Sequence, residues 1–247
     1  MIFTIARKEF RSLFATPSTW LVLGALQFIF AWFFLARLDS FLQVQAQLAQ
    51  IANAPGATLA IAVPLFATLA LIMLMLVPLF TMRLIAEERR NQTLVLLLSA
   101  PVSSTQIVAG KFLGLLSFLL LIIASCTLMV WLLAIGTRLD SGLLLGNALG
   151  LVLLSASYGA LGLYFSTLTA QPLIAALSSL ALLFGLWLVD ISGVEGDNAW
   201  RMLTPTRHFQ SFNNGLLNSA DLVYFALLIC TFLLLAARRL HNNRSYG

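Results

Sequence analysis

Charged residues are scarce in this 247-residue chain, and their scarcity decides its class. Asp, Glu, Lys and Arg make up 9% of the sequence and apolar residues 60%, whereas a soluble domain carries about 25% charged residues. The mean hydropathy is accordingly high, at +0.96. A chain with so few charges lacks the surface of a water-soluble fold, so the sequence indicates an integral membrane protein.

Cysteine and histidine are scarce as well, with two of each. Cys126 and Cys230 stand singly, without a CxxC or Cys/His cluster, so neither a disulfide framework nor a structural zinc site is expected. His208 has no second ligand near it in the sequence. We therefore expect His208 to be a polar loop residue, and we expect no metal site.

The chain also lacks a loop that could bind the phosphates of ATP. Such a loop needs the pattern GxxxxGK[ST], but Gly110-Lys111 is followed by Phe112, and Thr105 stands where the first glycine should be. The largest segment between apolar runs on the side of the amino terminus has about thirty residues, well below a domain of about 100. ATP hydrolysis by this chain alone is not expected.

Six apolar runs are what the chain does contain. A spanning helix needs about 20 mostly apolar residues, and runs near that length lie at 20–36, 61–82, 112–135, 143–165, 172–189 and 222–237. Their central thirds hold no Asp, Glu, Lys, Arg or His, which argues against an intramembrane enzyme and a proton- or sodium-coupled transporter. The predicted fold class is an all-α membrane protein with six transmembrane helices.

Residues 2–14 precede these runs and have a different pattern. Apolar residues recur there at helical spacing, and Arg7, Lys8 and Arg11 lie on the other side. This pattern is typical of a helix lying in the membrane interface, and Pro17 is expected to break the chain before the first span rises. A plain basic leader before the first span is the alternative.

Basic residues predict the orientation. With a cytoplasmic amino terminus, ten of the 14 Lys and Arg residues lie on the inner side and four on the outer side, as the positive-inside rule requires. The inner ones are Arg7, Lys8, Arg11, Arg83, Arg89, Arg90, Lys111, Arg238, Arg239 and Arg244. Both termini are then cytoplasmic, and the net charge of +5 indicates orientation and contact with anionic lipid rather than nucleic-acid binding.

Two external connections are predicted. Residues 37–60 are rich in glutamine and end in Asn53-Ala54-Pro55-Gly56, which indicates a short external helix and a turn. Residues 190–221 form the longer connector, in which aromatic residues suggest segments that dip into the interface. Whether an extracytoplasmic accessory subunit docks on this connector stays open.

Small residues recur every four positions at the start of the fourth apolar run. Gly142, Gly146 and Gly150 fall on one stripe, and such stripes let helix backbones approach closely in lipid. Packing within the chain and an interface between subunits are both compatible with the pattern.

The connection 83–111, on the cytoplasmic side, carries the most informative pattern. Glu87-Glu88-Arg89-Arg90 is followed by a leucine-rich run, and Pro101 is expected to end the helix that this run forms. Ser103 and Gln106 then match a capping box, which starts a new helix. We predict two short helices set at an angle at the membrane surface.

This segment resembles the membrane subunits of type-2 ABC exporters, in the branch of the gliding-motility and copper-enzyme-maturation permeases. The family pattern is an acidic residue, G-T-L-E-L-L-L, a small residue, P-V-S and I-x-x-G-K. Here it stands as Glu87-Glu88, Gln92-Thr93-Leu94-Val95-Leu96-Leu97-Leu98, Ser99-Ala100-Pro101-Val102-Ser103 and Ile107-Val108-Ala109-Gly110-Lys111. Gln92 replaces the usual glycine and Val95 the usual acidic residue.

The resemblance implies that the segment includes a coupling helix, which seats in a groove of a separate ATP-hydrolysing subunit. The residues implied for this contact are Glu87, Glu88, Arg89, Ser99, Ala100, Pro101, Val102, Ser103, Ser104, Thr105 and Gln106. It also implies two ATPase copies, which hold the ATP and magnesium, and a second permease that is either another copy or a related chain. No cofactor is expected in this chain itself.

The function that follows from the resemblance is that of an exporter permease in a bacterial inner membrane, with an apolar or amphipathic cargo. A membrane anchor or assembly factor without transport activity is the alternative. An anchor is compatible with the spans, but it leaves the pattern of 83–111 unexplained.

Overall fold

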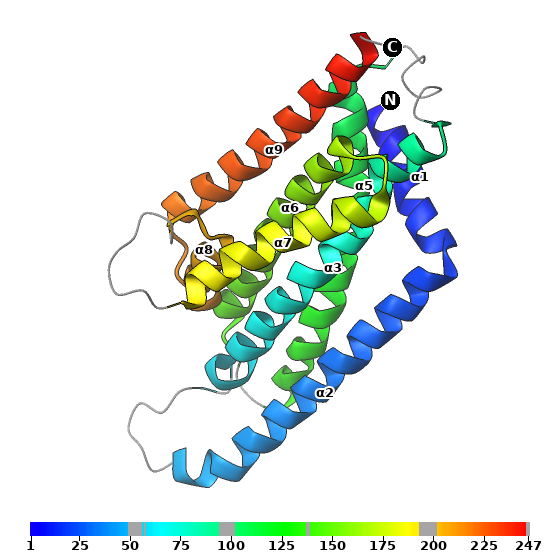
Figure 1. Ribbon diagram of the computed structural model, residues 1–247. Helices are drawn as coiled ribbons and strands as arrows, with labels where there is room; N and C mark the ends of the chain where they lie inside the picture. Colours follow the sequence, from blue (N-terminus) through cyan, green and yellow to red (C-terminus); the bar gives the residue numbers. More distant parts are fainter. Residues whose placement is uncertain (49–55, 57, 94–101, 137–138, 193–201, 246–247) are drawn as a thin grey trace.

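Helices make up the fold. The computed structural model describes residues 1–48, 56, 58–93, 102–136, 139–192 and 202–245 (Figure 1), and no strand occurs among them. The helices are α1 (Ile2–Ala15), α2 (Pro17–Leu48), α3 (Val63–Arg90), α5 (Ser104–Trp131), α6 (Ser141–Leu168), α7 (Pro172–Ile191), α8 (Pro205–Asn213) and α9 (Ser219–Ser245). A π-helical turn, Thr58–Ala62, precedes α3, and a 3-10 turn, Leu132–Ile135, follows α5. The predicted all-α fold is confirmed.

Six of the helices in the described part of the chain are long and apolar enough to cross a membrane. They cover Pro17–Val44, Thr58–Arg90, Ser104–Ile135, Ser141–Leu168, Pro172–Ile191 and Ser219–Asn242. Each contains one of the six apolar runs, so the predicted number of spanning helices is confirmed.

Two of the predicted connections turn out to be parts of longer helices. α2 continues to Leu48, so the separate external helix expected within 37–60 is, as far as Leu48, an extension of the first spanning helix. Likewise α3 continues to Arg90, and the helix that starts at Ser104 is the third spanning helix itself. Extending a helix adds one hydrogen bond per residue, whereas a new helix must be nucleated, so these helices run on through their polar ends. The other predicted short helix falls on residues 94–101, outside the described residues.

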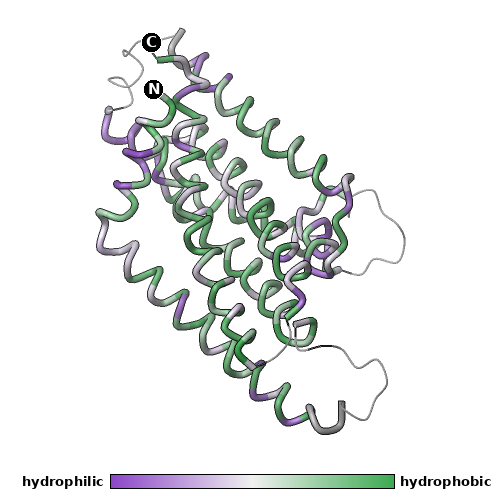
Figure 2. Tube along the Cα trace, turned by 180° about the vertical axis from the view of Figure 1, so that it is seen from behind, coloured by the Kyte–Doolittle hydropathy of each residue, from purple (hydrophilic) through white to green (hydrophobic). Residues whose placement is uncertain are grey.

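α6 is the centre of the bundle. It packs against α3, α5, α7, α8 and α9, while α1 lies along α5 and α2 runs at an angle away from the others (Figure 1). The start of α1 and the end of α9 lie at the same end of the bundle (Figure 1). Hydrophilic residues gather at that end and around α8, and apolar residues cover the length of the helices between them (Figure 2).

Close packing between α3 and α6 fixes the middle of this core. A Cβ atom at Gly162 of α6 would collide with the side chain of Thr81 of α3. One turn further on, the hydroxyl of Ser166 accepts hydrogen bonds from the backbone N–H groups of Ile85 (3.1 Å) and Ala86 (2.9 Å). In lipid, helices associate through such small residues and interhelical hydrogen bonds, so α3 and α6 behave as one packed pair.

Candidate functional site: the charged end of the bundle

The described residues of the predicted coupling segment lie at the ends of two spanning helices. Glu87, Glu88 and Arg89 belong to the last turn of α3, which ends at Arg90. Ser103 is the N-cap of α5, and Ser104, Thr105 and Gln106 form its first turn. Ser99, Ala100 and Pro101 lie outside the described residues, and the structure makes no statement about them.

The start of α5 carries the capping box that the sequence indicates. Ser103 Oγ accepts a hydrogen bond from the backbone N–H of Gln106 (3.2 Å), and Gln106 Oε1 accepts one from the N–H of Ser103 (3.2 Å). These bonds satisfy amide groups that have no partner within the helix. The box therefore defines the geometry of this turn, although the helix that it begins is 28 residues long rather than short.

The capped turn is anchored on one side and exposed on the other. Val102 and Ser104 are buried, and Val102 joins the hydrophobic core. Ser103 and Thr105 are exposed, and their hydroxyl oxygens lie 2.9 Å apart. The turn thus exposes a small polar surface, while its buried residues hold it against the hydrophobic core.

A buried ion cluster lies about two turns further along α5. The Lys111 side chain is 1% exposed, and its Nζ lies 2.9 Å from Glu9 Oε1 and 2.8 Å from Glu88 Oε1. Lys8 Nζ approaches the same two oxygens at 3.6 and 3.5 Å, from a side chain that is 65% exposed. The charges of the four residues sum to zero, and the cluster joins α1, α3 and α5 at one point.

Two glycines let α1 come close enough to α5 for this cluster to form. A Cβ atom at Gly110 would lie 2.8 Å from Ile5 Cβ, and one at Gly114 would lie 2.7 Å from Glu9 Cβ. These separations are shorter than carbon–carbon contacts allow. Gly110 and Gly114, four residues apart in α5, therefore form the surface against which α1 packs.

Sequence analysis missed this cluster. Lys111 was considered there as an inner basic residue, as part of the family pattern and in the comparison with a phosphate-binding loop, and neither Glu9 nor Gly114 was singled out. A signal was present, because Lys111 stands at the edge of an apolar run and between two glycines four residues apart. A lone lysine beside a surface suited to close packing indicates a paired carboxylate on the approaching helix.

Two other residues of the predicted segment are also held by the bundle. Arg89 Nη1 donates to the carbonyl oxygen of Thr167 at the end of α6 (3.1 Å), and Glu88 is bound to Lys111 as described above. Glu87 is exposed. Of the three charged residues implied by the resemblance, Glu88 and Arg89 therefore hold helices together within the chain.

The glycine stripe of α6 packs against α8. A Cβ atom at Gly150 would collide with the Phe212 side chain, and one at Gly146 would lie 3.4 Å from the Phe212 carbonyl oxygen. Gly142 is exposed, and its nearest contact is the side chain of Asp140, which caps α6. Gly146 and Gly150 thus serve packing within the chain.

His208 is not the isolated loop residue that the sequence suggested. It lies in α8, where its Nδ1 is 2.6 Å from Asp221 Oδ1 and its ring stacks on Tyr224 at a centroid distance of 3.8 Å. Both partners belong to α9. The interaction therefore fastens α8, within the predicted connector 190–221, to the start of α9. Within the described ranges, no group of three or more His, Cys, Asp or Glu residues could hold a metal ion.

The fold and this site define a class of protein: a multi-pass membrane protein whose six apolar helices are consistent with a transporter permease. The chain belongs to the ABC-2 family of transporter proteins, whose family model matches residues 3–243. A search of curated proteins found no match to the chain. Permeases of this family are membrane subunits without an ATPase site of their own, and membership implies partnership with an ABC ATPase.

Proposed function

We propose that this chain is the permease subunit of an ABC exporter, in which two permeases work with two copies of a separate ATPase. The observation that carries the proposal is the capped, exposed turn at the start of α5. Ser103 and Gln106 fix its shape through two reciprocal hydrogen bonds, and it continues into a spanning helix. A displacement applied to such a turn moves the whole helix with it.

The ion cluster extends this movement beyond α5. Lys111 binds carboxylates of α1 and α3, and the two glycines of α5 seat α1 directly on its surface. A displacement of the turn is therefore transmitted to α1 and to the end of α3 at the same time. Because Glu88 and Arg89 are engaged within the bundle, we assign the ATPase contact chiefly to residues 99–106, with Glu87 at the rim.

The remaining parts of the proposal rest on the sequence and on the resemblance. The pattern of 83–111 supports the branch of the gliding-motility and copper-enzyme-maturation permeases, and the family resemblance favours an apolar or amphipathic cargo. Basic residues support a bacterial inner membrane protein with cytoplasmic termini, and the shared end at which α1 begins and α9 ends fits an even number of spans. α1 is proposed to lie in the cytoplasmic interface.

Site-directed labelling tests the orientation. In a background without Cys126 and Cys230, a cysteine at position 45 or 214 is expected to react with an impermeant maleimide in intact cells. A cysteine at position 90, at the end of α3, is expected to react only with a permeant one, because the positive-inside rule places it in the cytoplasm. Labelling of position 90 from outside would reverse the topology.

Purification of the complex tests the proposed function. The tagged chain, expressed at native level and extracted in mild detergent, is expected to bring with it an ABC ATPase in a ratio of one to one. The rate of ATP hydrolysis by that complex should change when the complex is moved from detergent into vesicles. An ATPase held by a membrane anchor without transport activity should show no such change. Recovery of an intact permease assembly without an ATPase would contradict the proposal.

A further inference from the structure

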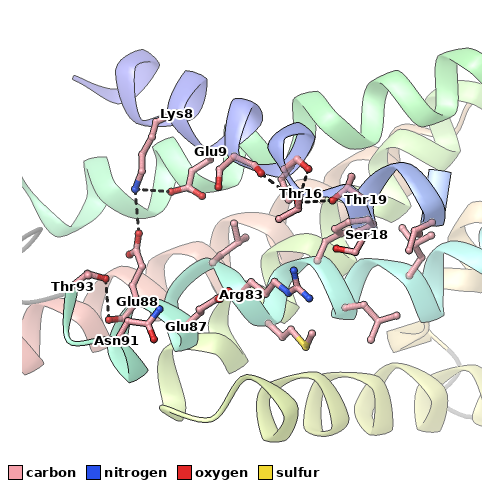
Figure 3. Close-up of a pocket in the computed structure, with 18 residues that line it drawn as sticks. Lys8, Glu9, Thr16, Ser18, Thr19, Arg83, Glu87, Glu88, Asn91 and Thr93 are labelled. Carbon is pink, nitrogen blue, oxygen red and sulfur yellow. Dashed lines mark hydrogen bonds and ion pairs between the residues drawn. The ribbon is translucent and has the colours of Figure 1, made fainter. Parts of the chain in front are cut away.

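A cleft opens between the first two helices and α3. It has a volume of about 790 Å³ and is bordered by the end of α1, the start of α2 and the charged half of α3 (Figure 3). Its apolar wall is formed by Leu13, Val22, Leu76, Leu79, Phe80 and Leu84. Its polar wall includes the hydroxyl groups of Thr16, Ser18 and Thr19, at the turn between α1 and α2. The cleft is therefore amphipathic.

The charges that line the cleft are of two kinds. Lys8, Glu9 and Glu88 belong to the neutral cluster around Lys111. Arg83 and Glu87 are exposed, and their side chains make no ion pair or hydrogen bond with the residues that the structure describes. The Arg83 side chain extends into the cleft, toward the turn that carries Thr16 and Ser18 (Figure 3). One free cation and one free anion are thus available to a ligand.

These features follow a fixed order along α3. Leu76, Leu79 and Phe80 come first, then Arg83, and one turn later Glu87. Residues four apart lie on the same helix face, with an axial separation of about 6 Å. From the membrane interior outward, the cleft therefore offers apolar surface, a positive charge and a negative charge.

We propose that this cleft binds a phospholipid whose headgroup carries a phosphate and a primary amine, as in phosphatidylethanolamine. The acyl chains lie against the apolar wall, the phosphate pairs with Arg83 and the exposed hydroxyl of Ser18, and the ammonium pairs with Glu87. The hydroxyl groups of Thr16 and Thr19 are already hydrogen-bonded to each other and to the carbonyl oxygen of Leu13. An anionic headgroup without an amine would leave Glu87 beside a negative charge. A choline headgroup carries positive charge but has no N–H to donate.

The lipid site does not involve the capped turn, but it shares Glu87 with the proposed rim of the ATPase contact. Lipid binding is therefore measured on the permease without an ATPase, so that its outcome does not depend on the exporter proposal. The lipid site also holds for either orientation of the chain, since the order of groups is defined relative to the membrane interior alone. Its occupant is part of the bilayer, so it reaches the cleft from the membrane rather than from water.

Native mass spectrometry of the delipidated protein tests the site. The protein is incubated in mixed micelles with equal amounts of ethanolamine, glycerol and choline phospholipids, and the retained lipid is identified. We expect the wild type to retain the ethanolamine lipid preferentially, by about tenfold, as loss of one hydrogen bond to a charged group would predict. Glu87→Gln should abolish the preference, and Arg83→Gln should weaken retention of all three lipids.

Two variants separate a specific site from a general effect of charge. Arg11→Gln removes an exposed basic residue of α1 outside the cleft and should leave retention unchanged. The double variant Arg83→Glu with Glu87→Arg keeps the net charge but reverses the order of the charges, and it should lose the ethanolamine lipid. Retention of that lipid by the reversed variant would overturn the proposal.

Free phosphoethanolamine distinguishes a lipid site from a site for the headgroup alone. In excess, it should not displace the bound lipid, because the apolar wall holds the acyl chains. Displacement would show that the cleft recognises a soluble phosphate ester. If instead the Arg83 and Glu87 variants change the dimer content of the protein but not the lipid that it retains, the cleft is a contact with a second copy of the chain. Either result would overturn the lipid assignment.

Discussion

Lys111→Met is expected to destabilise the protein strongly, with a loss of about 3–5 kcal/mol. Its side chain is 1% exposed and holds carboxylate oxygens of both Glu9 and Glu88 at less than 3 Å. Removing Lys111 leaves two partly buried carboxylates next to each other, with only the exposed Lys8 near them, and breaking a buried ion pair by removal of one partner has a cost of that size. The measurement is thermal unfolding of the purified permease in detergent, followed by intrinsic fluorescence.

Lys8→Met provides a matched control, because Lys8 approaches the same two oxygens. Its side chain is 65% exposed and its distances are 3.5 and 3.6 Å, so its removal should cost about 0–1 kcal/mol. The triple variant with methionine at positions 9, 88 and 111 should recover most of the loss, since a well-packed apolar cluster can replace a buried ionic one. Equal destabilisation by the two single lysine variants would show that burial does not set the strength of the cluster.

The double variant Ser103→Ala with Gln106→Ala is expected to uncouple the permease from its ATPase. It removes both side-chain bonds of the capping box, and loss of a cap costs about 0.5–2 kcal/mol of local helix stability. Binding that requires the ordered turn should weaken by about 2- to 30-fold. The amount of protein in the membrane should stay normal, because the apolar length of α5 is unchanged. Co-purification of the ATPase and its ATP turnover are the measurements.

Asp140→Ala is the matched control for the capping variant. Asp140 caps α6 through hydrogen bonds from the backbone N–H groups of Gly142 (2.9 Å) and Leu143 (3.2 Å), in the connection before the fourth span. It should destabilise its helix by a similar amount without affecting the ATPase. Full ATPase binding and full coupling in the Ser103/Gln106 variant would remove the main support for the proposed function.

The sequence allowed the features that depend on local pattern to be predicted. Six spanning helices follow from the length of apolar runs, because every backbone hydrogen bond of a helix in lipid is made within its own segment. The capping box of Ser103 and Gln106 was predictable for the same reason, since its partners are three residues apart. Helix boundaries were less predictable: α2 and α3 continue beyond their apolar runs, where polar side chains permit helix as readily as turn.

Tertiary structure alone decided which residues meet. Lys111 and Glu9 are separated by 102 positions, and nothing local to either residue identifies the other. The same holds for the contact of Gly150 with Phe212 and for the pair of His208 and Asp221. A glycine stripe or a lone charge indicates that a helix surface is suited to a partner. Which helix arrives there is decided by the docking of the whole bundle, because packing energy in lipid depends on the fit between two surfaces.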